Sequence, residues 1–271
     1  MDNSAQEDFW NGDQGRRWAD LSPELDAHHL PVTGILMARA GQVQGHTVLD
    51  VGCGQGALTE ALWQAGARVT GLDLSSALLA RARRHLPAEV TLLRQDVTEY
   101  RPEASFDLVI SQFGVMFFAD DVEGFADLRR ITRPGGRLIF ASWSGAEHNP
   151  WFSVPRRLAV DRLGDVPGDP DAPGPFRLRD IDRTCEILRT AGWFGVSGRA
   201  VDLHLTPAGS LAEVADFATR LGGASAVIRQ RGGGEADRQA VAADVAEAFA
   251  PYATSEGVLV PARINLFEAR A

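Results

Sequence analysis

The sequence contains no lysine, so all 27 residues counted as Lys or Arg are arginines. This absence excludes a Schiff-base lysine and a lysine general base. Cysteine is nearly absent too, since only Cys53 and Cys185 occur. Two cysteines cannot form a disulfide framework, and they give no cluster with metal-ligand spacing. We therefore expect a protein without a bound metal.

Long apolar runs are also missing. No stretch approaches the roughly 20 apolar residues of a membrane-spanning helix, and residues 1–4 lack the apolar core of a signal peptide. The formal net charge is −9, which argues against nucleic acid or an anionic membrane as a partner. We expect a cytoplasmic protein with a small-molecule substrate, and the composition leaves its oligomeric state open.

The chain is organised around residues 46–57. Apolar and β-branched residues lead into Asp50, glycines follow at positions 52, 54 and 56, and residues 58–63 have helical spacing. This pattern predicts a buried parallel strand, a tight glycine turn and the start of a helix. Glycines allow the backbone to approach a ligand closely. The 271 residues, 45% of them hydrophobic, are enough for one large α/β domain.

Two nucleotide cofactors fit this turn. The spacing Gly52-x-Gly54-x-x-Ala57 satisfies a dinucleotide fingerprint, which would make the protein an NAD(P)-dependent oxidoreductase. The same glycines preceded by Asp50 fit S-adenosylmethionine (SAM). A carboxylate repels a pyrophosphate but attracts the ammonium and sulfonium of SAM, by on the order of 4 kcal/mol at close range. Asp50 therefore favours SAM, bound by an enzyme or by a non-catalytic SAM-binding protein.

Later strands also end in acids. Asp73 ends the strand predicted over 67–75 and lies at the distance from the turn where a carboxylate accepts from a ribose diol. Asp96 ends the next strand, where it is placed to accept from an adenine amino group with Val97 against the ring. The full set expected to bind the cofactor is Asp50, Gly52, Cys53, Gly54, Gly56, Asp73, Leu74, Asp96, Val97, Ser111, Gln112, Trp10 and Trp18.

Five segments in order resemble the motifs of class I SAM-dependent methyltransferases: residues 50–56, 72–73, 95–97, 106–109 and 133–137. The resemblance implies an α/β fold with a Rossmann-like, doubly wound, seven-stranded sheet that is parallel except for the last strand. It places Asp50 and the glycines at the methionine half of SAM, Asp73 at the ribose and Asp96 at the adenine. The segments around Trp10, 113–120 and 149–151 further resemble a bacterial subgroup that acts on small molecules, with quinone-ring C-methyltransferases as more distant relatives.

We divide the chain into a helical arm (1–45), a SAM-binding core (46–206 and 254–271) and a helical insertion (207–253). The insertion holds two helical patterns separated by residues 231–234, whereas the Pro/Gly-rich stretch 145–180 predicts irregular structure. We interpret the insertion as a cap that excludes water from the substrate. A dimerisation surface is the alternative.

The sequence indicates the residues that would bind the methyl acceptor less clearly than those that would bind the cofactor. Met116, Phe117, His148 and Trp151 are our candidates for a substrate pocket that is mostly apolar or aromatic. Methyl transfer to a nitrogen, oxygen or carbon atom needs mainly alignment, and a general base only for some acceptors. His148 and His28 are weak candidates for that base. The acceptor itself is not identified by any motif.

Overall fold

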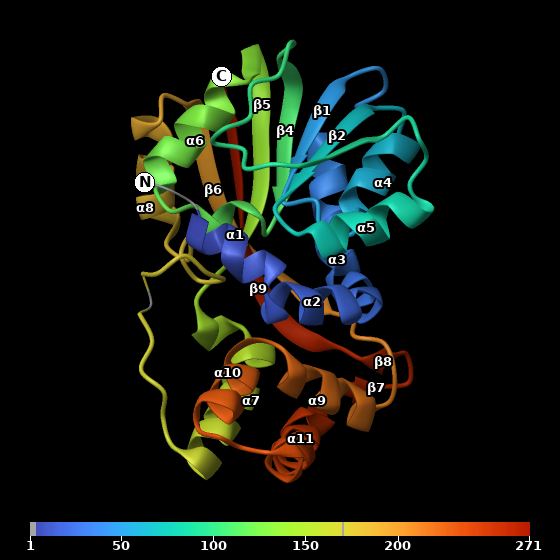
Figure 1. Cartoon of the computed structure of the whole chain (residues 1–271), viewed down its shortest axis with the longest axis vertical. Coiled ribbons are helices and arrows are strands. Elements are labelled where there is room, and N and C mark those ends of the chain that lie inside the picture. Colours follow the sequence, from blue (N-terminus) through green and yellow to red (C-terminus); the bar gives the residue numbers. More distant parts are fainter. Residues whose placement is uncertain (1–3, 170) are drawn as a thin grey trace.

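The computed structural model describes residues 4–169 and 171–271. Its centre is a seven-stranded sheet with the strand order β3-β2-β1-β4-β5-β9-β6 (Figure 1). The strands are β1 (Thr47–Val51), β2 (Arg68–Asp73), β3 (Thr91–Arg94), β4 (Phe106–Gln112), β5 (Thr132–Trp143), β6 (Phe194–Leu205) and β9 (Val260–Arg270). Strands β1 to β5 pair in parallel, and β9 is antiparallel to both β5 and β6. The predicted Rossmann-like sheet is confirmed.

Strand β1 lies at the point where the chain reverses its direction of winding. It pairs with β2 on one side and with β4 on the other, so that Asp50 lies opposite both Gly71 and Ile110. Val48 and Leu49 of β1 are fully buried, as expected for a parallel strand that is covered on both faces. Ligands of open α/β sheets bind at the carboxyl ends of the strands beside such a reversal.

Helices in two groups pack on this sheet. The first group is α3 (Ser22–Ala40), α4 (Ala57–Gln64) and α5 (Ser76–His85), and the second is α6 (Asp121–Arg130) and α8 (Ile181–Thr190). Helices α4 and α5 contact β1 to β3, whereas α6 and α8 contact β5, β6 and β9. Ser75 caps α5 because its side chain accepts a hydrogen bond from the Leu78 N–H (3.3 Å). The short helix η1 (Val115–Phe117) follows β4, and Val115 and Met116 are buried.

The N-terminal arm lies across the carboxyl ends of the strands. The predicted arm (1–45) also contains α3, and the part that lies here comprises α1 (Ser4–Asn11) and α2 (Asp13–Asp20), which lead into α3. Asn11 fastens it to the turn after β2: its amide nitrogen donates to the Leu74 carbonyl (3.0 Å), and its amide oxygen accepts from the Ser76 N–H (3.2 Å). An ion pair between Glu7 and Arg94 adds a second contact. The arm therefore covers the edge of the sheet at which ligands are expected.

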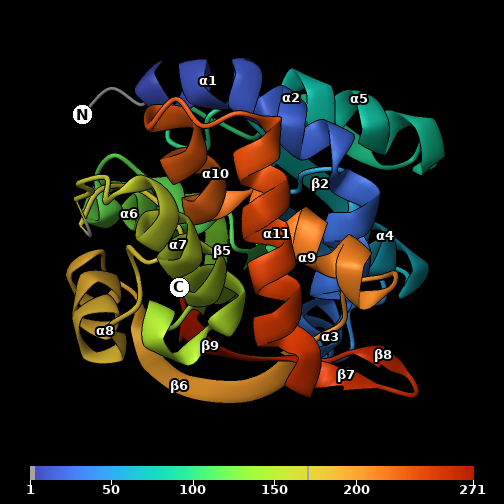
Figure 2. The same cartoon turned by 90° about the horizontal axis from the view of Figure 1, so that it is seen from below.

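A separate group of helices packs below the sheet in Figure 1. It comprises α7 (Pro150–Leu163), α9 (Leu211–Arg220), α10 (Gly222–Gln230) and α11 (Glu235–Phe249), which contact one another. We call these four helices the cap. Figure 2 shows them side by side across the end of the sheet, with α1 and α2 along one border. The hairpin of β7 (Ala253–Thr254) and β8 (Gly257–Val258) follows, after the short helix η3 (Ala250–Tyr252).

The cap differs from the sequence expectation in two ways. The stretch predicted as irregular contains η2 (Ala146–His148) and the 14-residue helix α7. Pro150 does not prevent α7 because it occupies the first turn, where its missing N–H costs no hydrogen bond. The insertion holds three helices instead of two, since Gly222 adopts a positive φ of 66° and separates α9 from α10. Among residues 4–169 and 171–271, no helix is long and apolar enough to cross a membrane.

Candidate active site

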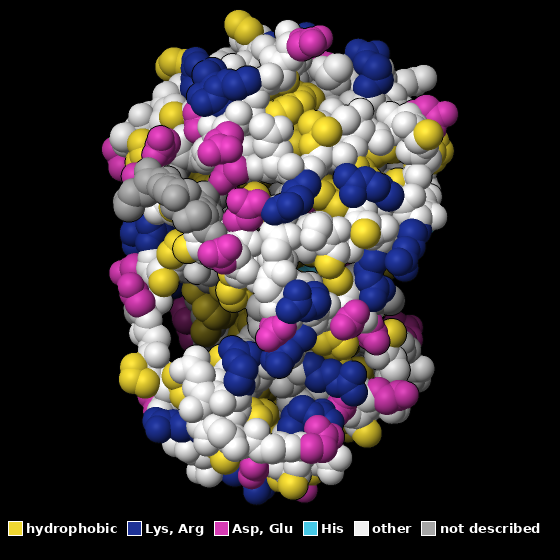
Figure 3. Space-filling model, in the orientation of Figure 1, with side chains coloured by type: hydrophobic (Ala, Val, Ile, Leu, Met, Phe, Trp, Pro, Cys, Tyr) yellow, Lys and Arg dark blue, Asp and Glu magenta, His cyan; other side chains and the backbone are white. Residues whose placement is uncertain are grey.

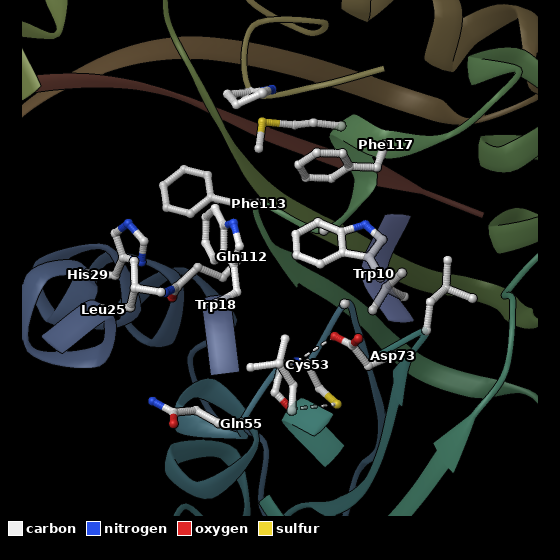
Figure 4. Close-up of a pocket in the computed structure, with 18 of the residues that line it drawn as sticks. Trp10, Trp18, Leu25, His29, Cys53, Gln55, Asp73, Gln112, Phe113 and Phe117 are labelled. Carbon is white, nitrogen blue, oxygen red and sulfur yellow. Dashed lines mark hydrogen bonds between the residues drawn. The ribbon is translucent and has the colours of Figure 1, made fainter. Parts of the chain in front are cut away.

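A cavity of about 250 Å³ lies where the carboxyl ends of β1, β2 and β4 meet the arm and the cap. Figure 4 shows Cys53, Gln55 and Asp73 on one side of it and His29, Gln112 and Phe113 on another. Most of the residues named from the sequence line it together: Trp10, Trp18, Asp50, Gly52, Cys53, Gly54, Asp73, Leu74, Asp96, Val97, Gln112, Met116, Phe117 and Trp151.

Gly56 and Ser111, two of the residues expected at the cofactor, are absent from the cavity wall. Gly56 begins α4 with a φ of 99°, and a Cβ there would lie 2.6 Å from the Leu86 side chain. Ser111 is fully buried, and its hydroxyl donates to the Val51 carbonyl (2.7 Å) and accepts from the Gly114 N–H (3.1 Å). Both residues shape the turn instead of facing the cavity.

Neither candidate base lies on the cavity wall. The His148 side chain is 43% exposed, and its Nε2 atom lies 3.6 Å from Glu147 on the outer surface. The sequence-based placement of His148 in the substrate pocket is therefore corrected. His28 is fully buried behind Trp151, with the two ring centroids 4.0 Å apart. Neither ring nitrogen of His28 has a hydrogen-bond partner in the described part of the chain.

The glycine turn requires glycine for a steric reason. Gly52 has a φ of 70°, and a Cβ there would lie 2.6 Å from the Gly114 Cα. The N–H groups of Gly52 and Cys53 both donate to the Leu72 carbonyl (2.8 and 2.9 Å), which draws the turn against β2. At Gly54, by contrast, a Cβ would meet nothing within 4 Å. The turn therefore presents bare backbone to the cavity.

Three of the predicted acids are held in fixed positions. Asp50 is buried and accepts from the Thr59 hydroxyl (2.6 Å), and desolvation raises the pKa of its carboxyl to about 7. Asp73 accepts from the Gly54 N–H (2.8 Å) and the Ser75 N–H (2.7 Å), while burial raises its pKa. Asp96 accepts from the N–H and the hydroxyl of Thr98, both at 2.9 Å.

The cavity wall is acidic. Asp26 of α3 joins Asp50, Asp73 and Asp96 on it, and none of the described lining residues is an arginine. Burial also raises the pKa of Asp26, which hydrogen-bonds with Gln55. Such a wall attracts a cation and repels a phosphate. A cationic sulfonium ligand fits this wall, and a dinucleotide pyrophosphate does not.

Aromatic side chains form the remainder of the wall. Trp10 of the arm contacts Trp18 and Phe117 edge to face, with ring centroids 5.6 and 5.2 Å apart. On the other side, Phe113 stacks on Trp143 with centroids 4.2 Å apart. The cap contributes Trp151 and Phe152, and residues 221–224. This part of the cavity suits an apolar or aromatic molecule.

Two polar side chains face this aromatic part. The Thr33 hydroxyl donates to Gln112 Oε1 (2.8 Å), which leaves the Gln112 amide nitrogen as a donor on the cavity wall. His29 lines the cavity with its ring centroid 5.3 Å from that of Phe113. Burial lowers the pKa of His29 to about 4, so its imidazole is neutral at neutral pH.

Sequence reasoning missed His29, Asp26 and Gln55. A signal for His29 was present, because Leu25 and His29 are four residues apart and share one face of α3. Both of them line the cavity. The sequence pattern alone did not show that this face of α3 meets the sheet edge.

Comparison with known proteins identifies the family. A family model described as a methyltransferase domain matches residues 49–140. Demethylmenaquinone methyltransferase of Renibacterium salmoninarum is 31% identical over 175 residues, which cover 61% of this chain and 73% of the relative. The chain belongs to the class I SAM-dependent methyltransferases.

Other curated relatives match a smaller part of the chain. Malonyl-[acyl-carrier protein] O-methyltransferase of Pseudescherichia vulneris is 32% identical over 133 residues, covering 48% of this chain and 53% of the relative. The chain thus spans about half the length of the first curated relatives that it matches. The matched domain, residues 49–140, runs from β1 to β5 and leaves out the arm and the cap.

Solved structures share the fold of this chain. Phosphoethanolamine N-methyltransferase 2 of Haemonchus contortus, solved with SAM, superposes with a TM-score of 0.53 at 19% identity. The superposition covers 90% of this chain and 56% of that one. At this identity the likeness concerns the fold alone.

Proposed function

We propose that this methyltransferase binds SAM in the cavity and transfers its methyl group to a small, mostly apolar or aromatic molecule. When bound, SAM supplies a methyl group on a positively charged sulfonium, which an acceptor atom takes by in-line displacement. One observation carries the proposal: the cavity joins an acidic wall, with no arginine among its described residues, to an aromatic wall. The first suits the cationic cofactor, and the second suits the acceptor.

The acidic wall supports specific roles toward the cofactor. Asp73 accepts from the Gly54 N–H at one carboxylate oxygen and from the Ser75 N–H at the other, and its carboxylate lines the cavity as an acceptor for a ribose hydroxyl. The bare backbone at Gly54 leaves space for a ligand beside it. We assign Asp50 and the glycine turn to the methionine half, and Asp96 with Val97 to the adenine. Trp10 and Trp18 of the arm would cover the bound cofactor.

The acceptor atom is a nitrogen, oxygen or carbon atom, and the polar groups of the aromatic wall favour the first two. His29 in its neutral form accepts a hydrogen bond from an O–H or N–H group, and Gln112 donates one. Together they would orient the acceptor, while the surrounding rings exclude water. His148 and His28 take no part in this proposal because neither lines the cavity.

The names of two relatives suggest further substrates for this chain, and the lining of the cavity favours one of them over the other. A malonyl acceptor, named for the relative from Pseudescherichia vulneris, would bring a carboxylate to a wall where the structure describes no arginine. That chemistry is unfavourable here. A quinone-like or other neutral ring, as the name demethylmenaquinone methyltransferase indicates for another relative, fits the aromatic wall better.

We also propose how the chain is divided and where in the cell it is located. We retain the division into arm (1–45), core (46–206 and 254–271) and insertion (207–253), with α7 packed against the insertion. A cytoplasmic location agrees with the free, buried thiols of Cys53 and Cys185. A metal-independent reaction is part of the proposal, since alignment supplies much of the rate.

A thermal-shift and calorimetric titration with SAM, S-adenosylhomocysteine, NAD and NADP tests the function. Only the first two ligands should raise the melting temperature, because a ligand that binds the native state stabilises it by mass action. Stabilisation by NAD or NADP would favour an oxidoreductase. Binding of SAM without methylation of any aromatic alcohol or amine would favour a non-catalytic SAM-binding protein.

A further inference from the structure

A second recess, of about 660 Å³, lies outside the cavity between α2 and the cap helices α9 to α11. We call it the arginine groove. Its charged lining residues are Arg17, Asp20, Arg220, Arg229, Glu235 and Arg238. Figure 3 shows basic side chains gathered at the waist of the molecule, over α2 and the cap. A positive recess stands out on a chain whose formal net charge is −9.

Two of the four arginines are already paired. Arg238 forms ion pairs with Asp216 and Glu235, and Arg220 approaches Asp216 at 2.6 Å. Asp20 is paired with Arg81 at 3.3 Å. These contacts fix one side of the groove and neutralise its acids.

The other two arginines, Arg17 and Arg229, are exposed. Neither makes an ion pair or a side-chain hydrogen bond with any other residue that the structure describes. Arg17 comes from the arm and Arg229 from α10, so the two face the groove from opposite walls. Guanidinium groups with free donors bind phosphoryl oxygens in a bidentate manner.

The groove and the cavity share a wall. On α2, Trp18 lines the cavity and Arg17 lines the groove, which Leu21, directly after α2, also lines. On the cap side, Leu221 and Ala224 line the cavity, whereas Arg220 and Ser225 line the groove. Neighbouring residues of α2 and of the cap therefore face the cavity on one side and the arginine groove on the other.

We propose that the arginine groove binds a phosphoryl group of the acceptor, while the apolar reacting end of the same molecule fills the cavity. The acidic cavity wall excludes an anionic group, whereas the groove has two free arginines for it. That the groove binds an anion does not depend on the proposed function. That this anion belongs to the acceptor rests on the proposed function.

The first test titrates inorganic diphosphate into the full-length chain by calorimetry. The variant Arg17→Gln/Arg229→Gln should weaken binding by about tenfold or more, and added salt should weaken the wild type as well. Arg199→Gln is the matched control, because Arg199 is exposed on β6 and does not line the groove. Equal affinities in the wild type and the double variant, or no saturable binding by the wild type, would overturn the proposal.

The second test separates a free anion from a phosphorylated acceptor. Phenylhexyl phosphate should bind more tightly than inorganic phosphate, and Trp151→Ala should reduce that difference. Equal binding of the two would limit the groove to free phosphate and overturn the link to the acceptor. S-adenosylhomocysteine is titrated in parallel and should bind the double variant like the wild type. If the wild type does not bind S-adenosylhomocysteine, that result would contradict the proposed function but not the anion site.

Discussion

The backbone N–H of Gly54 donates a hydrogen bond to Asp73 across 2.8 Å. This contact joins the glycine turn after β1 to the last residue of β2. The second carboxylate oxygen of Asp73 accepts from the Ser75 N–H at 2.7 Å, which fixes the orientation of the carboxylate. The acid proposed to hold the ribose is therefore positioned before any cofactor binds. Such preorganisation reduces the entropic cost of binding.

The first prediction concerns this carboxylate. Asp73→Ala should weaken binding of S-adenosylhomocysteine by about 1–3 kcal/mol, because it leaves the hydroxyls of the ribose diol unpaired. Asp73→Asn retains an acceptor oxygen and should lose less. Asp161→Asn, an exposed acid on α7, is the control. An unchanged dissociation constant in a folded Asp73→Ala variant, measured by calorimetry, would contradict the ribose assignment.

The second prediction is a pH dependence that comes from Asp50. Its pKa of about 7 in the free protein lies above the ordinary 3.8, so a cation bound beside it should lower the pKa and release a proton. SAM affinity should therefore rise between about pH 5.5 and 7.5. Calorimetry in buffers of different ionisation enthalpy measures the released proton.

Asp50→Asn provides the control for this prediction, since the amide has no charge to lose. In that variant the affinity should be lower at neutral pH and nearly constant over the same range. A wild type whose SAM affinity does not change with pH would place the cation away from Asp50.

The third prediction concerns the arm. Deletion of residues 1–20 removes the Trp10–Phe117 contact and the hydrogen bonds of Asn11 to the turn after β2. We expect the core to remain folded but to bind S-adenosylhomocysteine more weakly, because one aromatic wall of the cavity is lost. Asn11→Ala should produce a smaller loss of the same kind. If the truncated chain binds as tightly as the full chain, the arm only packs against the core.

The sequence predicted the structure best where the local backbone geometry requires a particular type of residue. The crowded turn at Gly52 needs a positive φ, and the strands around Asp50, Asp73 and Asp96 show their acids at fixed places after apolar runs. These patterns predicted the individual strands that lead to these acids. Helix α7 was missed because Pro150 and Pro155 lower the helical signal, and the packing of α7 on α10 and α11 outweighs that cost.

His29 was missed for another reason. Helix α3 carries histidines at two adjacent positions, and only tertiary packing decides that His29 faces the cavity while His28 lies behind Trp151. The candidate His148 was placed near the cleft because it follows β5. The short helix η2, however, leaves its side chain on the surface. Side-chain direction after a strand end depends on the loop, which the sequence pattern did not determine.

The fourth prediction concerns acid stability. Burial lowers the pKa of both His28 and His29, so the unfolded chain binds their protons first as the pH falls. The two histidines should therefore lower the free energy of unfolding below about pH 6.5, by up to about 1.4 kcal/mol per pH unit each, while the raised pKa of Asp50 acts in the opposite direction over part of the same range. His28→Leu should flatten this decrease and raise stability at neutral pH, because it removes two unpartnered ring nitrogens. Urea unfolding at several pH values measures both effects.

The exposed residue His204 offers the control for this series. His204→Leu should follow the wild type at every pH. Were His28→Leu to lose stability in acid as steeply as the wild type, the buried histidines would not be responsible for the decrease.

The last prediction compares Trp151 and His148, both of which the sequence predicts in the acceptor pocket. Trp151 is buried in the cavity wall and packs on His28 and Phe217, whereas the His148 side chain is 43% exposed outside it. Trp151→Ala should reduce the turnover of any acceptor that the wild type methylates, because the acceptor loses the surface that aligns it. His148→Ala should remain near normal.

Trp151→Phe retains an aromatic surface and should restore most of the rate, which separates alignment from a loss of folding. Circular dichroism and the affinity for S-adenosylhomocysteine verify that each variant is intact, and that affinity should stay nearly unchanged. Loss of activity in His148→Ala together with one limb of the pH–rate profile would reverse this conclusion. The reaction would then depend on a base outside the cavity wall, and alignment by the aromatic residues would not be sufficient.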